Sequence, residues 1–275
     1  MPKARKVIPG VDAKLLIKDA AKLIPDPSRR LFLRGATSLG AITLLTGCDI
    51  VDEDTAARAL LAISRFNDRV QAAIFDPDKL APTYPESAIT RPFPFNAYYG
   101  EEDAPEIDGE TYMLEVGGLV ENKKPWTLEE LYALPQEKQI TRHICVEGWS
   151  AIGKWSGVPL HEILTRAKIR YNAQYAVFHC YDVMPNREGA LTPYYESIDM
   201  VDAFHPQTIL AHTLNDAPLA VGHGAPLRLR VERQLGYKQA KYIKHITIVD
   251  RLDTIFGGNG GYWEDVAGYE WYGGI

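Results

Sequence analysis

The sequence predicts an α+β domain with a mixed sheet over residues 107–275. Short segments that alternate apolar and polar residues begin at Tyr112 and are typical of β-strands. The connections between them are brief and carry helix signals, a combination that favours an α+β fold. At 275 residues and 46% hydrophobic composition, the chain is long enough to bury a substantial core.

We expect strands at residues 112–116, 175–181, 208–211, 227–231 and 245–249. Thr127 is a predicted N-cap for a helix over 128–134, because Glu129 and Glu130 fall in its first turn. Asn215 and Asp216 predict a turn after the third of these strands.

Residues 48–106 are predicted to form a helix followed by an extended arm. Apolar residues recur at helical spacing over 54–75. Prolines at positions 77, 82, 85, 92, 94 and 105 then exclude long regular elements.

Residues 1–47 have the parts of an export signal. Ser28-Arg29-Arg30-Leu31-Phe32-Leu33 resembles the twin-arginine signal, and an uncharged stretch leads to Leu45-Thr46-Gly47-Cys48. That ending resembles a lipoprotein processing site with Cys48 as the lipidated residue. The resemblance implies export in the folded state by the twin-arginine machinery, a periplasmic location and a lipid anchor at Cys48. The alternative is that the arginines flank a buried helix and that Cys48 is a core residue.

The charge distribution limits the function classes. Residues 1–47 carry a net charge of +6 and the remainder −12, so the body is a poor candidate for nucleic-acid binding. Three cysteines cannot form a disulfide framework. No apolar run approaches the roughly 20 residues that a spanning helix needs.

The segment 142–150, Arg-His-Ile-Cys-Val-Glu-Gly-Trp-Ser, is the most informative stretch of the chain. Cys145 could be a small buried residue, a nucleophile paired with His143, or a metal ligand. The sequence lacks the Cys-x-x-Cys or His-x-x-x-His spacing of a zinc site. A metal held by Cys145 would therefore have to bring most of its own ligands.

Cys145-Val-Glu-Gly-Trp-Ser, followed by Trp155-Ser-Gly-Val-Pro-Leu, resembles the molybdenum-binding core of the sulfite oxidase family. The stronger likeness is to the bacterial periplasmic branch that includes the methionine-sulfoxide reductase catalytic subunit. The resemblance implies a sulfite-oxidase-type domain and a molybdenum cofactor with a single molybdopterin. It also implies that Cys145 is the protein ligand to the metal, and a soft thiolate suits that role.

The resemblance extends from about Phe95 to the C-terminus and implies further cofactor contacts. These are Asn96, Tyr99, Gly100, His179, His223, Arg228, Gly236, Tyr237 and Lys238. His179 stands where the reductase branch has threonine, and His223 is more like the sulfite oxidases. Taken singly, Arg228, His223 and Lys238 could equally be surface or turn residues.

The resemblance implies two-electron, oxygen-atom-transfer chemistry on a small-molecule substrate. Glu147 is a candidate proton donor or acceptor, and Tyr195, or its neighbour Tyr194, is expected near the metal. The chain has no haem-attachment motif, so we expect electrons from a separate redox partner, a membrane cytochrome or another electron-transfer protein.

Reduction of an S- or N-oxide is the favoured direction. Sulfite oxidation is the alternative, with Arg142, Arg187 and Arg230 as suppliers of positive charge. Two other classes are a cofactor-free binding protein and a Cys145–His143 hydrolase. The aromatic C-terminal segment 262–272 is expected to serve packing, with a place at the pocket mouth as the alternative.

Overall fold

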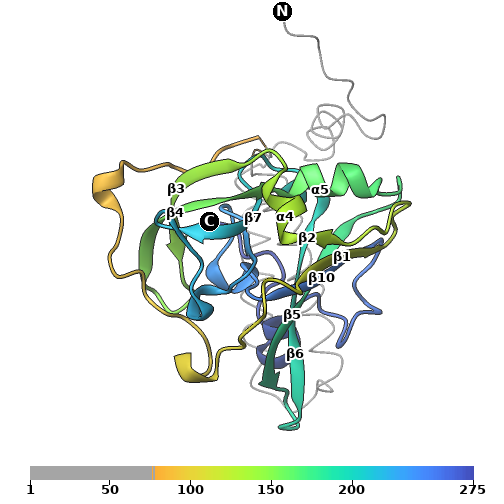
Figure 1. Cartoon of the computed structure of the whole chain (residues 1–275). Helices are drawn as coiled ribbons and strands as arrows, with labels where there is room; N and C mark the ends of the chain where they lie inside the picture. The colour runs from red at the N-terminus through yellow and green to blue at the C-terminus, as the bar shows by residue number, and fades with distance from the viewer. Residues whose placement is uncertain (1–75, 77) are drawn as a thin grey trace, which may run out of the picture. The chain divides into compact units, whose positions relative to one another are not determined.

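Two five-stranded sheets form the framework of the protein in the computed structural model, which describes residue 76 and residues 78–275 (Figure 1). The predicted export signal, Cys48 and the predicted helix over 54–75 lie outside these residues. All described residues belong to one compact unit, Ser64–Ile275.

The first sheet has the order β2-β1-β10-β5-β6. Its strands are β1 (Met113–Gly118), β2 (Trp126–Thr127), β5 (Tyr175–Pro185), β6 (Leu191–Asp199) and β10 (Ile243–Val249). β1 runs parallel to β10, whereas the other pairs are antiparallel. The sheet is therefore mixed, as the sequence predicts.

The second sheet has the order β3-β4-β7-β8, and β9 also pairs with β7. Its strands are β3 (Glu137–Ile144), β4 (Ser150–Pro159), β7 (Ile209–Leu214), β8 (Ala217–Pro218) and β9 (Arg228–Arg230). β3 and β4 form a hairpin whose last pair is Ile144 with Ser150. The loop of this hairpin contains Cys145.

The helices are short and lie in the connections. They are α4 (Leu128–Tyr132), α5 (Leu160–Ala167), α6 (Met200–Ala203) and α7 (Tyr262–Ala267), with 3-10 turns η1 (Glu86–Ala88), η2 (Glu101–Asp103), η3 (Val221–His223) and η4 (Gly236–Lys238). Thr127 caps α4 in a capping box with Glu130, which confirms the predicted N-cap. Across residues 78–275, the helices are too short or too polar to cross a membrane.

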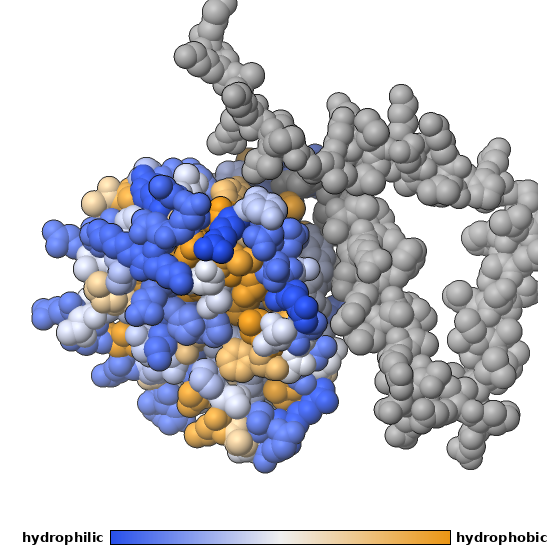
Figure 2. Space-filling view, turned by 90° about the vertical axis from the view of Figure 1, so that its right-hand side faces the viewer, coloured by the Kyte–Doolittle hydropathy of each residue, from blue (hydrophilic) through white to orange (hydrophobic). Residues whose placement is uncertain are grey.

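The alternation of the strands places one face of each in a shared core. Leu114 and Val116 of β1 and Ile246 and Ile248 of β10 are all buried. A smaller cluster surrounds the fully buried Trp155 of β4 in the second sheet. On one face of the protein, hydrophilic residues predominate around a band of hydrophobic ones (Figure 2).

The arm over residues 78–106 lies along the second sheet (orange to yellow in Figure 1). Tyr84 donates its backbone N–H to Ile140, and Thr90 donates to Ile152. Further along, Phe93 packs edge-on against Trp155 at 5.2 Å between ring centroids. These contacts carry the next residues of the arm, which include Asn96, to the end of the β3–β4 hairpin.

Candidate functional site

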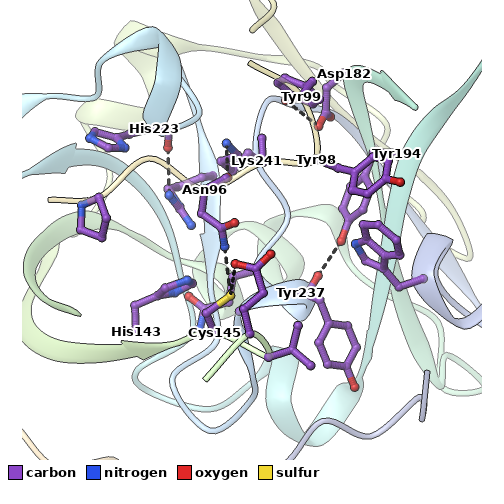
Figure 3. A pocket seen from close by; sticks show the side chains of 18 of the residues that line it. Asn96, Tyr98, Tyr99, His143, Cys145, Asp182, Tyr194, His223, Tyr237 and Lys241 are labelled. Carbon is purple, nitrogen blue, oxygen red and sulfur yellow. Dashed lines mark hydrogen bonds between the residues drawn. The ribbon is translucent and has the colours of Figure 1, made fainter. Parts of the chain in front are cut away.

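A pocket of about 260 Å³ opens where the arm, the β3–β4 loop and the C-terminal segment meet (Figure 3). Eight of the residues that the sequence assigns to the site line it: Asn96, Tyr99, Cys145, Glu147, His223, Arg228, Gly236 and Tyr237. They come from segments far apart in the chain, so only the fold brings them together.

Cys145 lies at the start of a tight loop that joins β3 to β4. Its backbone N–H donates to Trp149, and Gly148 donates back to Cys145. Gly148 has φ of +90°, a left-handed conformation that glycine adopts without strain. The loop thus holds the Cys145 side chain at the pocket in a fixed orientation.

Two polar side chains contact the Cys145 sulfur. Asn96 Nδ2 lies 3.3 Å from Sγ, and Glu147 Oε2 lies 3.8 Å from it. Trp149 Nε1 donates to the same Glu147 oxygen at 3.0 Å and so fixes this carboxylate. Burial raises the pKa of the Cys145 thiol, and the Asn96 amide opposes that shift. A bound metal would overcome the burial effect by stabilising the thiolate.

Arg228 and Lys241 are the cations that line the pocket. Burial, followed by the neighbouring Arg230, lowers the pKa of Arg228 to about 9, and its Nε is buried without a hydrogen-bond partner. Burial and the nearby Arg228 lower the pKa of Lys241 to about 7. Arg228, whose Nε has no partner, and the part-buried Lys241 fit a bound anion, which would stabilise their charged forms.

Lys241 also connects the arm to the pocket. Its Nζ donates to the backbone carbonyl of Asn96 at 2.9 Å and to that of Gly222 at 3.1 Å. Lys241 belongs to none of the motifs in the sequence. The repeated Lys-x-x-Lys spacing with Lys238 was the available indication.

A chain of buried hydrogen bonds ends at His143, two residues before Cys145. Arg230 donates to His143 Nδ1 at 3.0 Å and makes a two-point contact with Glu232. Burial, followed by the charge of Arg230, holds the pKa of His143 well below its usual range. His143 is therefore neutral and occupied by Arg230, an arrangement that makes it a poor base for a cysteine hydrolase.

Gly236 of η4 lies directly against His143. A Cβ at this position would come within 2.8 Å of two ring atoms. The close approach requires glycine here for a steric reason rather than for backbone conformation.

Asp182 of β5 brings a buried carboxyl group to the pocket. Tyr99 donates its hydroxyl to Asp182 Oδ2 at 3.1 Å, while Oδ1 is buried without a partner. Burial raises the pKa of Asp182 to about 6. Asp182 cannot be predicted from the sequence as a site residue, because an acidic residue in a strand carries no motif of its own.

The ammonium group of Lys238 does not line the pocket, contrary to the expectation for a cofactor contact. Its Nζ lies 2.5 Å from Glu196 and 2.9 Å from Glu264, and all three side chains are buried. The 3-10 turn η4 directs Lys238 toward these carboxylates on the other side of the element.

Three other expected residues also lie outside the pocket lining. His179 faces the opposite side of β5 from Asp182 and stacks on His245 at 4.0 Å. Tyr195 stacks on Phe256 at 4.2 Å and donates to Asp265. Its neighbour Tyr194 lines the pocket instead, because consecutive strand residues face opposite sides. Gly100 is the N-cap of η2 next to Tyr99.

The family model for the oxidoreductase molybdopterin binding domain matches residues 101–256. The chain belongs to this family, that of the sulfite oxidases. It is therefore an oxidoreductase with a molybdopterin-binding domain, as the Cys145 motif predicts.

Named relatives agree with this assignment. The chain is 50% identical over 257 residues to a candidate protein-methionine-sulfoxide reductase subunit, YedZ1, of Azospira oryzae, covering 94% of this chain and 92% of that protein. It is 37% identical over 147 residues to the protein-methionine-sulfoxide reductase catalytic subunit MsrP of Xanthomonas axonopodis, covering 51% and 46% of the two chains.

Among solved structures, the sulfane dehydrogenase SoxCD of Paracoccus pantotrophus is similar at 22% identity and a TM-score of 0.47. The similarity covers 54% of this chain and 40% of that chain.

The residues present fit a molybdopterin group. Cys145 would offer a thiolate to the metal, and Arg228 and Lys241 would offer charge to a phosphate. The partnerless Arg228 Nε and Asp182 Oδ1 are the donor and acceptor that an anionic, hydrogen-bonding ligand would satisfy.

Proposed function

We propose that the chain is a molybdenum-dependent reductase of an S- or N-oxide with a single molybdopterin and Cys145 as its metal ligand. One observation favours reduction over sulfite oxidation: the three arginines that could hold the sulfite dianion have other contacts. Arg142 lies over the Tyr84 ring, Arg187 donates to the Val266 carbonyl, and Arg230 is paired with buried Glu232. None of the three lines the pocket.

The relatives support the same direction, since two of them are named as methionine-sulfoxide reductase subunits. Reduction of a sulfoxide consumes two electrons and two protons and releases a thioether and water. The bound molybdenum group supplies the two-electron chemistry. Glu147, fixed by Trp149 beside the Cys145 sulfur, is placed to hold a proton for this reaction.

Asn96 and Lys241 act together in this proposal. Asn96 contacts the Cys145 sulfur with its amide, while its backbone carbonyl accepts from Lys241. An anion bound by Lys241 and Arg228 would thus be linked to the orientation of the metal ligand through one residue of the arm.

The purified holoenzyme tests the direction. With a reduced viologen as electron donor, we expect turnover of methyl sulfoxides and no oxidation of sulfite with ferricyanide as acceptor. Sulfite oxidation without sulfoxide reduction would overturn the proposal. His223 favours that second candidate, because histidine at this position resembles the sulfite oxidases and it lines the pocket.

Electron supply and location form part of the same proposal. We expect a membrane cytochrome as electron donor, a role that fits the subunit designations of the relatives. The Arg29-Arg30 pair and Leu45-Thr-Gly-Cys48 support folded export to the periplasm and lipidation at Cys48.

Replacing both arginines with lysine should retain the protein in the cytoplasm. Cys48→Ala should release it from the membrane fraction while leaving it exported. Export of the double lysine variant at the wild-type level would contradict the twin-arginine route.

A further inference from the structure

One side of the pocket is formed by aromatic side chains that the proposed reaction does not use. We call Tyr98, Trp263 and Tyr269 the aromatic wall; all three line the pocket. Trp263 contacts Tyr98 edge-on at 5.4 Å and stacks on Tyr269 at 5.7 Å. Tyr194 and Tyr237 line the pocket beside it.

The local structure of the C-terminal segment produces this wall. Trp263 lies on α7, which ends at Gly268 in a left-handed conformation. This turn brings Tyr269 back so that its backbone N–H donates to the Trp263 carbonyl. The Arg187 side chain donates to the Val266 carbonyl and ties α7 to the β5–β6 hairpin.

The wall differs in chemistry from the cationic part of the pocket. Figure 3 shows His223 on one side and Tyr194 on the other, with Cys145 between them. Arg228 of β9 and Lys241, in the connection between η4 and β10, supply the positive charge of the pocket. Tyr98 is 69% exposed, which places the wall at the entrance.

The wall also lies outside the part of the chain that the family model matches. Tyr98 precedes residue 101, and Trp263 and Tyr269 follow residue 256. The molybdopterin-binding region therefore does not by itself define this side of the pocket.

We propose that the aromatic wall binds the non-reacting hydrocarbon or aryl group of a neutral sulfoxide and so determines substrate specificity. Aromatic faces bind apolar groups and polarisable sulfur without requiring charge. This inference rests on the proposed reductase function and identifies the part of the substrate that is recognised. In this role the wall residues position the substrate and are distinct from the residues at the metal.

The test compares two sulfoxides with the same reacting group. Dimethyl sulfoxide has no group that reaches the wall, whereas methyl phenyl sulfoxide presents an aromatic ring. With molybdenum-normalised holoenzyme, Trp263→Ala and Tyr98→Ala should each raise KM for methyl phenyl sulfoxide about 3- to 10-fold. We expect kcat, and KM for dimethyl sulfoxide, to stay within about twofold of wild type, since contact to a remote group changes binding alone.

Matched variants separate recognition from a loss of folding. Trp263→Phe should restore most of the lost affinity. Tyr171 is a fully exposed aromatic residue outside the pocket lining, so Tyr171→Ala should leave KM for both sulfoxides unchanged. Tyr98→Ala carries the test if Trp263→Ala does not fold, because Tyr98 is mostly solvent-exposed.

Unchanged KM values, or equal changes for both sulfoxides, would overturn the role of the wall while leaving the reductase function intact. A wild-type holoenzyme that reduces neither sulfoxide would instead overturn the proposed function, and with it this inference.

Discussion

Replacing Lys238 should destabilise the folded protein rather than weaken cofactor binding. Its Nζ lies 2.5 Å from Glu196 and 2.9 Å from Glu264, and none of the three side chains is more than 1% exposed. Lys238→Met leaves two buried carboxylates without a cation. Breaking a buried ion pair in this way costs about 3–5 kcal/mol.

That cost corresponds to a fall in Tm of roughly 6–20 °C for a chain of this size. Burial and the neighbouring Glu264 raise the pKa of Glu196, so protonation relieves part of the cost. The fall should therefore be larger at pH 8 than at pH 5. Thermal unfolding followed by circular dichroism on the cofactor-free protein measures it.

Lys241→Met is the matched control for this prediction. Lys241 has only backbone carbonyls as hydrogen-bond partners, and its pKa is about 7, so at pH 8 its loss removes little charge stabilisation. We expect a nearly unchanged Tm and a reduced content of bound pterin. A Lys238→Met variant that keeps the wild-type Tm but loses pterin, together with a Lys241→Met variant that retains pterin, would refute the structural role of Lys238.

Two further predictions concern the packing and the charge of the pocket. Gly236→Ala should cost about 1–3 kcal/mol of unfolding free energy, because the added methyl group would overlap the His143 ring. Gly117→Ala, which meets no atom within 4 Å, should change it by less than about 0.5 kcal/mol, and equal effects in urea unfolding would contradict the close approach. Burial raises the pKa of Asp182 from its ordinary value of 3.8 to about 6 in the folded protein. Between these values the native state binds a proton that the unfolded state has released, so the free energy of unfolding falls as pH rises from about 4 to 6. Asp182→Asn should remove this fall and raise the unfolding free energy by at most about 3 kcal/mol at pH 8. If the unfolding free energies of the two proteins change in parallel with pH, burial does not raise the pKa of Asp182.

The predicted strands and the capped helix agree with the structure where alternation or capping is plain in the sequence. β1, β5, β7, β9 and β10 overlap the predicted segments. β3 was not predicted, because its inward positions hold Gln139, Thr141 and His143, which are polar and buried. β4 contains Gly153 and Gly157, which obscure its alternation.

The candidate site could be predicted only as far as the order of residue types allows. Cys145, Asn96 and Arg228 lie at the pocket, as the motif comparison implies. The direction of a side chain from a 3-10 turn cannot be read from a motif, and the Lys238 ammonium group lies against Glu196 and Glu264 instead of at the pocket. Likewise, strand alternation requires one of two adjacent tyrosines to face the pocket without specifying which.

Contacts between distant segments were beyond the sequence. Asp182 meets Tyr99 across 83 residues, and the aromatic wall joins the arm to the C-terminal segment. Such contacts depend on how the sheets pack, which local patterns do not encode.

The central claim is that Cys145 ligates molybdenum in a molybdopterin pocket. The most direct measurement is metal content with X-ray absorption at the molybdenum edge, comparing wild type and Cys145→Ala from a host that makes the cofactor. We predict about one molybdenum per wild-type chain, with one protein-derived sulfur ligand that is absent in the variant. Metal-free wild-type protein from that host, or an identical sulfur shell in both proteins, would contradict the assignment.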